Sequence, residues 1–406
     1  MRVLLSGGGT GGHVYPALAV IDALTSRPPY DRAQNGASGT AGVETQQGTS
    51  STRLDPSSIG PSTGPGRHAE FLWVGSHAGV EADVVPRAGI PYAAIDVAGL
   101  RGMAALQLAR NVVLLLRGTQ QAYRIIGRFQ PDVIFVTGGY VSAPVVLAGR
   151  VRRVPIVIYL PDIVPGMAIR SLAQLATRVA VSFEESRQYL PREKVVVTGY
   201  PVRGELFSAD RDSARQNLGL DPAVSTLLVF GGSRGARRIN RAVVAALDEL
   251  LSVCQVIHVS GRLDIAEMQQ RREALPAALK DRYHLFAYLH EEMIDALAVA
   301  DLVVSRAGAA TLGEFPAAGL PAIVVPYPHA GAHQAENAAV LAEAGGAIIV
   351  PDDELTGDRL AETVRQALAD EERLALMRIR MSRLARPDAA WRIAEMLREE
   401  VSGGAG

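Results

Sequence analysis

The chain has 406 residues, 48% of them hydrophobic, and its formal net charge is −1. This length predicts two domains with sizeable cores, and the near-neutral charge argues against a general affinity for nucleic acid. The single cysteine, Cys254, excludes an intrachain disulfide and a cysteine-rich metal site and is typical of a reducing cytoplasm, while no apolar run reaches the ~18 residues of a membrane span.

A glycine-rich turn, Ser6–His13, opens the chain. It joins the apolar run Val3–Leu5, which is typical of a buried strand, to the helical pattern Val14–Leu24, with Pro16 expected in the first turn of that helix. Glycines let a ligand approach the backbone, and a helix start favours an anion or a developing negative charge. His13 can take up a proton near neutral pH, although a helix-capping role without chemistry is the plainer alternative. Because the first strand starts at once, we expect no signal peptide.

The same turn matches a dinucleotide-binding pattern, Gly7-x-Gly9-x-x-Gly12. That pattern needs an acidic residue after the second strand, where it holds a ribose. The next strand, Glu70–Val74, is followed by Gly75-Ser76-His77, with no Asp or Glu in place. We therefore expect no nicotinamide or flavin, and no cofactor of another kind.

The stretch Thr25–Arg67 is rich in Gly, Pro, Ser and Thr and has few large apolar residues, so we predict a disordered insertion. Beyond it, apolar runs alternate with helical patterns, which predicts an α/β domain built on a parallel sheet with helices on both faces. Ligands of such sheets gather at the carboxyl ends of the strands. The predicted elements are a helix at 80–88, a strand at 92–97, a loop at 99–102, a helix at 104–129, a strand at 132–137, a helix at 141–151 and a strand at 155–159.

The long helix predicted over Ala104–Phe129 carries arginines seven residues apart. Arg110, Arg117 and Arg124 therefore fall on nearly one face, beside the apolar run Val112–Leu116. One interpretation is a core helix with a solvated arginine edge. The other is a surface element that contacts anionic lipid headgroups.

The second half repeats the plan after a turn-rich stretch, Thr198–Arg203. A strand predicted at Thr226–Phe230 leads into a second glycine-rich turn, Gly231–Ala236, which suits a phosphate. Asp210 and Asp212 spell Asp-x-Asp, a metal–nucleotide signature, but they follow no strand and fit helix capping better, so we expect no metal. We predict an N-terminal domain at 1–200, a C-terminal domain at 201–385, and a C-terminal helix and tail at 386–406.

A set of short motifs with a specific order and spacing runs through both halves: Gly8–His13, Gly99–Gly102, Gly138–Tyr140, Pro201–Arg203, Gly231–Arg237, Arg306–Glu314, and His333 and Gln334 with Asn337. In these motifs the chain resembles the MurG family, glycosyltransferase family 28, over nearly its whole length outside the insertion. The resemblance implies a GT-B fold, with two Rossmann-like domains facing a cleft. It also implies metal-independent, inverting transfer of N-acetylglucosamine from UDP-N-acetylglucosamine to a muramyl-pentapeptide linked to a polyprenyl diphosphate, the lipid I to lipid II step of peptidoglycan synthesis. The enzyme would be peripheral, on the cytoplasmic face of the cell membrane, and would contact an anionic membrane surface.

The resemblance further implies roles for individual residues. We choose His13 as the base that deprotonates the acceptor hydroxyl. Arg203 and Ser233 would meet the diphosphate, and Glu314 would accept both ribose hydroxyls. The other donor-site residues would be Thr10, Gly11, Gly12, Asp162, His290 (whose backbone would read the uracil edge), Ala309, Ala310, Thr311, Leu312, Gly313 and Gln334. The acceptor and membrane side would use Arg101, Arg110, Arg117, Arg124 and Tyr140.

Two residues depart from the family pattern. Asp162 stands where the family has an asparagine that contacts the acetamido group of the sugar, and Tyr200 replaces the usual asparagine before Pro201. Both departures bear on sugar specificity more than on the fold. The alternatives are a related GT-B glycosyltransferase with another lipid or small-molecule acceptor, a sugar-nucleotide epimerase, and an inactive nucleotide-sugar-binding protein.

Overall fold

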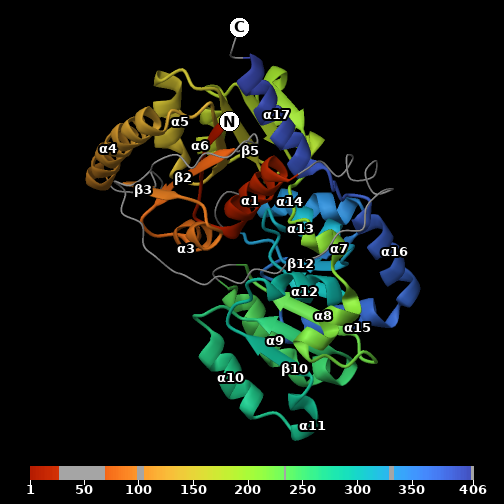
Figure 1. The fold of residues 1–406 in the computed structure, drawn as a ribbon. Helices are drawn as coiled ribbons and strands as arrows, with labels where there is room; N and C mark the ends of the chain where they lie inside the picture. The colour runs from red at the N-terminus through yellow and green to blue at the C-terminus, as the bar shows by residue number, and fades with distance from the viewer. Residues whose placement is uncertain (27–68, 98–104, 233–234, 329–332, 404–406) are drawn as a thin grey trace, which may run out of the picture.

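The computed structural model describes residues 1–26, 69–97, 105–232, 235–328 and 333–403. All but the first two residues of the predicted insertion, and the whole predicted loop at 99–102, lie outside the described residues, as do Arg101 and Ser233. Two parallel sheets, each covered by helices, make up the described part and confirm the predicted GT-B class (Figure 1). The first sheet uses the first half of the chain and the second sheet uses the second half.

The N-terminal sheet has seven parallel strands in the order β3-β2-β1-β4-β5-β6-β7. The strand order reverses beside β1, so the turns after β1 and β4 meet at the carboxyl edge, where ligands of doubly wound sheets bind. Its strands are β1 Arg2–Gly7, β2 Glu70–Ser76, β3 Tyr92–Ile95, β4 Val133–Gly138, β5 Ile156–Leu160, β6 Arg178–Val181 and β7 Val195–Val197. Its helices are α1 Gly11–Thr25, α3 Val80–Arg87, α4 Ala105–Phe129, α5 Ser142–Val151 and α6 Met167–Leu172, with short 3₁₀ turns at Glu184–Tyr189 and Arg192–Lys194.

The C-terminal sheet has six parallel strands in the order β10-β9-β8-β11-β12-β13, with its reversal beside β8. Its strands are β8 Thr226–Phe230, β9 Gln255–Val259, β10 Tyr283–Phe286, β11 Leu302–Ser305, β12 Ala322–Val324 and β13 Ala347–Ile349. The helices of this half of the chain are α7 Glu205–Ser208, α8 Arg211–Leu218, α9 Arg237–Val253, α10 Ile265–Glu273, α11 Ala277–Lys280, α12 Glu292–Val299, α13 Thr311–Ala318, α14 His333–Glu343, α15 Gly357–Ala369 and α16 Glu371–Ser382, followed by α17 Ala389–Gly403, which packs on the N-terminal domain.

The strands are apolar because helices cover both faces of each sheet. Val3, Leu5 and Phe135 are fully buried on one face of the N-terminal sheet, and Leu4 and Ile134 are fully buried on the other. Burying one such side chain contributes about 1.5–3 kcal/mol. Burial of side chains on both faces of the strands therefore stabilises the fold. The turns at the carboxyl edges contribute less to the core and can carry ligand-binding residues.

The last helix returns to the first domain. Helix α17 packs on α1, far from the sheet that precedes it in the chain (Figure 1). Arg178 forms ion pairs with Glu399 and Glu400, and Arg398 donates to the Ala23 carbonyl at 3.3 Å. The chain therefore passes from the first sheet to the second between β7 and β8 and returns between α16 and α17. The domain limits at 200 and 385 stay a prediction.

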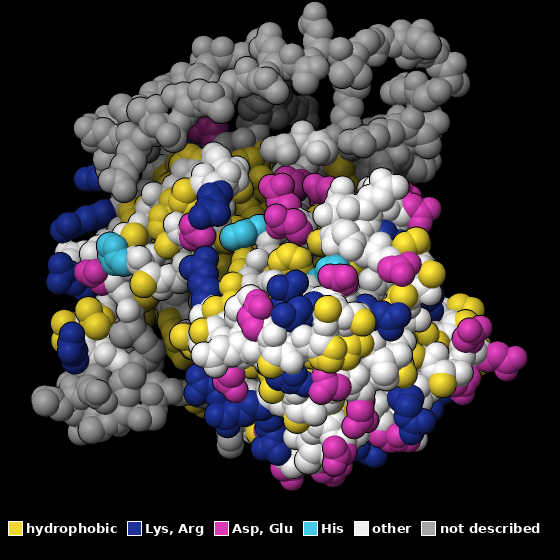
Figure 2. All heavy atoms as spheres, turned by 90° about the horizontal axis from the view of Figure 1, so that it is seen from below, with side chains coloured by type: hydrophobic (Ala, Val, Ile, Leu, Met, Phe, Trp, Pro, Cys, Tyr) yellow, Lys and Arg dark blue, Asp and Glu magenta, His cyan; other side chains and the backbone are white. Residues whose placement is uncertain are grey.

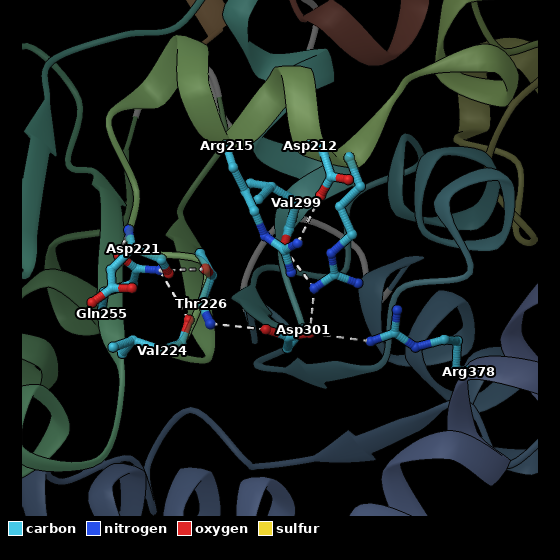
Figure 3. A network of polar contacts seen from close by, with 10 residues as sticks. Asp212, Arg215, Asp221, Val224, Thr226, Gln255, Val299, Asp301 and Arg378 are labelled. Atoms are coloured by element: carbon cyan, nitrogen blue, oxygen red, sulfur yellow. Dashed lines mark hydrogen bonds and ion pairs between the residues drawn. The ribbon is translucent and has the colours of Figure 1, made fainter.

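A half-buried carboxylate connects helices to the second sheet. Asp301 accepts a hydrogen bond from the Thr226 backbone N–H at 2.9 Å and pairs with Arg211 and with Arg378 (Figure 3). It thereby ties α8 and α16 to the strands β8 and β11. The Asp210 side chain accepts from the Ser213 N–H at 2.8 Å at the start of α8, which confirms the predicted helix cap.

Helix α1 differs from the sequence prediction at both ends. It begins at Gly11 and not at Val14, so Pro16 lies in its second turn, and it still includes Thr25. A proline inside a helix has no N–H for the carbonyl four residues earlier. The Gly12 carbonyl therefore lacks its usual partner within α1.

Candidate functional site

Two glycine turns of the N-terminal domain meet at the reversal point of the sheet. The Gly8 N–H donates to the Gly138 carbonyl at 3.2 Å, which joins the turn after β1 to the turn after β4. Gly138 and Gly139 have φ of +118° and +86°, where a side chain would be strained. A Cβ on Gly139 would also collide with the backbone of Gly8. Both glycines are thus required by the close approach of the two turns.

His13 lies on top of this junction, as the third residue of α1. Its carbonyl accepts a hydrogen bond from the Thr137 hydroxyl at 2.6 Å, and a Cβ on Gly138 would lie 3.1 Å from its Nε2. Both ring nitrogens are buried and have no hydrogen-bond partner among the described residues. Burial lowers the pKa of His13, and the nearby carboxylates of Asp162 and Glu81 oppose that shift. The ring is therefore neutral near pH 7, with a lone pair available to accept a proton.

The two domains touch through the same turn. A Cβ on Gly12 would lie 3.6 Å from the Ala309 Cβ and 3.9 Å from the Ala310 N of the C-terminal domain. The Thr311 hydroxyl donates to the Gly308 carbonyl at 2.7 Å, just where α13 begins. The start of α13 therefore lies opposite the start of α1, and the amide groups of two helix N-termini converge on one place.

A half-buried acid and an arginine lie beside this junction. Burial raises the pKa of Glu314 to about 7, against the opposing charge of Arg203. The Arg203 guanidinium carbon lies 5.0 Å from the centre of the Tyr15 ring, which belongs to α1. The junction thus contains a carboxyl group poised between its two protonation states and a cation held by an aromatic ring of the other domain.

Three of the predicted donor-site residues already have partners. Asp162 accepts from the Asn337 amide at 2.8 Å, and the Asn337 amide oxygen accepts from the Ile163 N–H at 3.0 Å. Gln334 accepts from the Tyr327 N–H at 2.9 Å, and the backbone N–H of His290 donates to Glu292 at 3.1 Å. When the sugar or the uracil of a donor bound to these groups, it would replace or share these hydrogen bonds.

Asn337 is a residue whose role the sequence motif did not reveal. Its side chain is fully buried and also donates to the Ala307 carbonyl at 3.0 Å. It therefore connects the loop after β5 of one domain with the loop after β11 of the other. Its place in the motif with His333 and Gln334 was a signal, but only the fold places it between the domains.

Of the remaining predicted residues, Thr10 lies at the edge of the junction, where a Cβ on Gly12 would be 3.8 Å from its hydroxyl oxygen, while Tyr140 and the arginines of α4 lie away from it. Arg101 and Ser233 lie outside the described residues. Thr10 is exposed at the start of α1, and Tyr140 is exposed where the turn after β4 leads into α5. Helix α4 packs on α5 and β3, on the outer flank of the N-terminal domain, so its arginines do not reach the junction (Figure 1). Its Arg117 pairs with Asp96 at 2.9 Å. The structure therefore brings together His13, Gly11, Gly12, Asp162, Arg203, Ala309, Ala310, Thr311, Leu312, Gly313 and Glu314.

Figure 2 shows how charged side chains are distributed on one face of the described part. The face in Figure 2 carries intermixed basic and acidic side chains, which agrees with the net charge of −1. Within the described ranges, no group of three or more His, Cys, Asp and Glu side chains is arranged to hold a metal ion, and no helix is long and apolar enough to cross a bilayer.

Comparisons with known proteins cover nearly the whole chain. Residues 65–181 match the glycosyltransferase family 28 N-terminal domain, and residues 226–393 match the family 28 C-terminal domain. The chain is 42% identical to a protein of Roseiflexus sp., with 98% of this chain and 94% of that protein covered, and 40% identical to one of Moorella thermoacetica over the full length of both. Both relatives are named UDP-N-acetylglucosamine–N-acetylmuramyl-(pentapeptide) pyrophosphoryl-undecaprenol N-acetylglucosamine transferase.

Solved structures agree at the level of the fold. The crystal structure of Acinetobacter baumannii MurG matches with a TM-score of 0.67 and 26% identity, covering 98% of this chain and 99% of that one. A UDP-GlcNAc 2-epimerase from Neisseria meningitidis, bound to UDP-GlcNAc, matches with a TM-score of 0.65 at 14% identity, covering 98% and 100% of the two chains. At that identity the epimerase shares only the fold.

Proposed function

This chain belongs to the MurG family of glycosyltransferases, and from that premise we propose that it transfers N-acetylglucosamine from UDP-N-acetylglucosamine to a polyprenyl-diphosphate-linked muramyl-pentapeptide. The structural observation that carries the proposal is the meeting of Gly12 with Ala309 and Ala310. Gly12 thus lies against the α13 N-terminus of the other domain, and the neutral His13 imidazole, one residue further along α1, packs on Gly138. A base and an anion-binding site that lie near each other are the two groups that an inverting transfer needs.

In the proposed reaction, the C-terminal domain holds the donor. Glu314 accepts the ribose hydroxyls, and the α13 amides with Arg203 lie along the diphosphate. The backbone at His290 reads the uracil edge, and Gln334 and Asp162 lie toward the sugar. The hydrogen bonds that these three groups make in the structure support their positions, because they hold the side chains and backbone in place before the ligand arrives.

His13 acts on the acceptor. Its unpartnered ring nitrogen takes the proton of the acceptor hydroxyl as the hydroxyl oxygen bonds to the anomeric carbon, and UDP leaves from the opposite face of the sugar. The negative charge that appears on the leaving diphosphate develops beside the α13 amides and Arg203, so positive groups are in place where charge forms. The lowered pKa of His13 keeps the base unprotonated near neutral pH.

The acceptor has a polyprenyl chain, so the enzyme works at a bilayer surface. We propose that α4 makes that contact on the cytoplasmic side, as a peripheral element. Its exposed surface combines Val113 and Leu116, 63% and 66% exposed, with Arg110 and Arg124. Helix α4 contains no Asp or Glu, which suits an anionic surface.

The direct test is a transfer assay with radiolabelled UDP-N-acetylglucosamine and a panel of acceptors: a polyprenyl-diphosphate muramyl-pentapeptide, the same lipid without the peptide, and a soluble muramyl-peptide. The proposal expects label in the disaccharide product of the first acceptor. Label in another acceptor alone would support the related-glycosyltransferase alternative. Conversion of the donor to UDP-N-acetylmannosamine without any acceptor would support the epimerase.

A further inference from the structure

A buried carboxylate under the first glycine turn has no part in the mechanism above. Glu81, on α3, is 1% exposed, and it forms no ion pair with any residue in the described ranges. Carboxylates are rarely buried so completely unless they are paired or satisfied by hydrogen bonds. Its position therefore needs an explanation beyond packing.

The hydrogen bonds of Glu81 connect two strand ends. One oxygen accepts from the Gly9 N–H at 2.8 Å, in the turn after β1. The other accepts from the Ser76 hydroxyl at 2.6 Å and, more weakly, from the Ser76 N–H at 3.4 Å, at the end of β2. The carboxylate thus fastens the glycine turn to the neighbouring strand of the sheet.

The position of this carboxylate accounts for the presence of glycine at two places in the chain. A Cβ on Gly8 or on Gly79 would collide with the Glu81 carboxyl group. Gly9, whose N–H donates to one of the carboxylate oxygens, has φ of +89°. The turn is therefore shaped around Glu81, and three residues later it reaches Gly12 at the domain junction.

Glu81 also carries charge next to the base. The charged groups that face His13 are Glu81 from α3 and Asp162 from the loop after β5, while the turn after β4 contributes the backbone of Gly138. When the buried imidazole takes a proton, it becomes a cation with little water around it. A negative charge close by stabilises that cation, as the acid does in a catalytic triad, although here it acts without direct contact.

We propose that Glu81 is a positioning residue of the transfer reaction, which holds the Gly8–Gly12 turn and the His13 ring in their reactive arrangement and stabilises the protonated form of His13 with its charge. This inference rests on the proposed role of His13 as the base. In our proposal the UDP part of the donor is held by the C-terminal domain, so the affinity for UDP itself should not depend on Glu81.

Two substitutions separate the hydrogen bonds from the charge. In Glu81→Gln, the amide oxygen can still accept from Gly9, and the amide nitrogen can donate to the Ser76 hydroxyl, which can then donate to the Ala78 carbonyl at its present 2.9 Å. In Glu81→Ala, both the connection and the charge are lost. Asp83→Asn is the matched control, because it removes an exposed carboxylate from the same helix, where Asp83 pairs only with Arg87 among the described residues.

We expect Glu81→Ala to lower kcat by about a hundredfold, the usual effect of a misplaced catalytic group, with the UDP dissociation constant unchanged by calorimetry. We expect Glu81→Gln to keep more of the turnover and to move the acidic limb of the kcat/KM profile about one pH unit lower, because loss of a negative charge lowers the pKa of His13. Asp83→Asn should match the parent in both measurements.

A parent-like kcat in Glu81→Ala, or an acidic limb in Glu81→Gln that stays where it is in the parent, would overturn the proposal. Circular dichroism melts of both variants show whether lost turnover is lost folding, and Glu81→Gln decides the case if Glu81→Ala does not fold. If the parent protein itself transfers no sugar, that result contradicts the proposed function and does not by itself test the role of Glu81. Titration of the His13 C2 proton by NMR, assigned with His13→Asn, then still tests whether Glu81 raises that pKa.

Discussion

The Tyr200 hydroxyl donates a hydrogen bond to the Gly12 carbonyl, at 3.4 Å, within the N-terminal domain and beside its junction with the other domain. That carbonyl is available because Pro16 has no N–H to offer it. Tyr200 is 5% exposed, packs edge-on against Tyr159 with ring centres 6.2 Å apart, and lies so close to Gly313 that a Cβ there would collide with its ring. The residue that departs from the family pattern therefore connects the acceptor-side turn with the donor-side helix.

Tyr200→Phe tests this connection, because it removes the hydroxyl and keeps the ring. We expect a loss of about 1 kcal/mol in unfolding free energy, the usual net value of one hydrogen bond. We also expect a lower kcat, since the Gly12 carbonyl loses its partner at the reaction centre. Thermal melts and initial rates with saturating donor measure the two effects.

Tyr283→Phe is the comparison for Tyr200→Phe. Its hydroxyl bonds to His258 at 2.7 Å in the core of the C-terminal domain, so the variant loses a buried hydrogen bond away from the junction. It should lower the melting temperature and leave kcat unchanged. Equal kcat values for Tyr200→Phe and the parent would mean that the Tyr200 hydroxyl serves stability alone.

The affinity for UDP should depend on the protonation of Glu314. Burial raises its pKa to about 7 from the ordinary 4.5, so the free protein holds a proton there over much of the neutral range. Ribose hydroxyls donate to the ionised carboxylate, so binding favours that form and releases the proton. We expect UDP affinity to rise as pH increases toward 7 and to level off above it.

Calorimetry in buffers of different ionisation enthalpy measures this proton release directly. Glu314→Gln should weaken UDP binding by more than about tenfold, because a charge-assisted hydrogen bond contributes ~1.5–3 kcal/mol, and it should flatten the pH dependence. The sign for folding is the opposite: the raised pKa contributes stability to the free protein that is fully present below 4.5 and is lost as pH rises through 7. UDP affinity that falls with rising pH would remove Glu314 from the ribose site.

The sequence predicted the architecture because strand and helix periodicities depend on burial, and both sheets are covered on both faces. It also predicted the strand ends at which the glycine turns gather. It did not reveal Glu81, since a single acid on a helical pattern looks the same whether it faces water or a buried turn. The Asn337 bridge and the pairing of Arg117 with Asp96 join residues far apart in the chain, so only tertiary packing defines them.

Turnover should continue in EDTA. The diphosphate charge is met in our proposal by the α13 amides and by Arg203, groups that a chelator does not affect. The measurement compares the initial transfer rate under three conditions: with no addition, with EDTA, and with EDTA followed by an excess of magnesium or manganese. Complete loss of turnover in EDTA, recovered by either ion, would replace the amide-based account of leaving-group stabilisation with a metal-dependent one.

Binding to membranes should depend on α4, and the structure sharpens which residues matter. Val112, Val113, Leu116 and Tyr123 are 43%, 63%, 66% and 41% exposed, which the core-helix interpretation does not expect. Arg117 already pairs with Asp96, so its charge is partly used within the domain. The two remaining arginines of the predicted face, Arg110 and Arg124, are exposed beside the apolar side chains.

The double substitution Arg110→Gln with Arg124→Gln should therefore reduce sedimentation with phosphatidylglycerol vesicles, since each near-surface cation contributes about 1 kcal/mol with anionic lipid. The difference from the parent should shrink as salt rises, because headgroup attraction is screened. UDP affinity should stay the same, as the donor site lies in the other domain.

Helix α16 provides the matched control for α4. It also exposes apolar side chains, Leu376 at 51% and Ile379 at 50%, and it carries Arg373 and Arg380, but its first turn is acidic. Arg373→Gln with Arg380→Gln should therefore leave vesicle binding unchanged. If the two double variants lose binding equally, the attraction is general and α4 is not the contact. If the parent does not sediment with the vesicles at all, the exposed apolar face of α4 has a different partner.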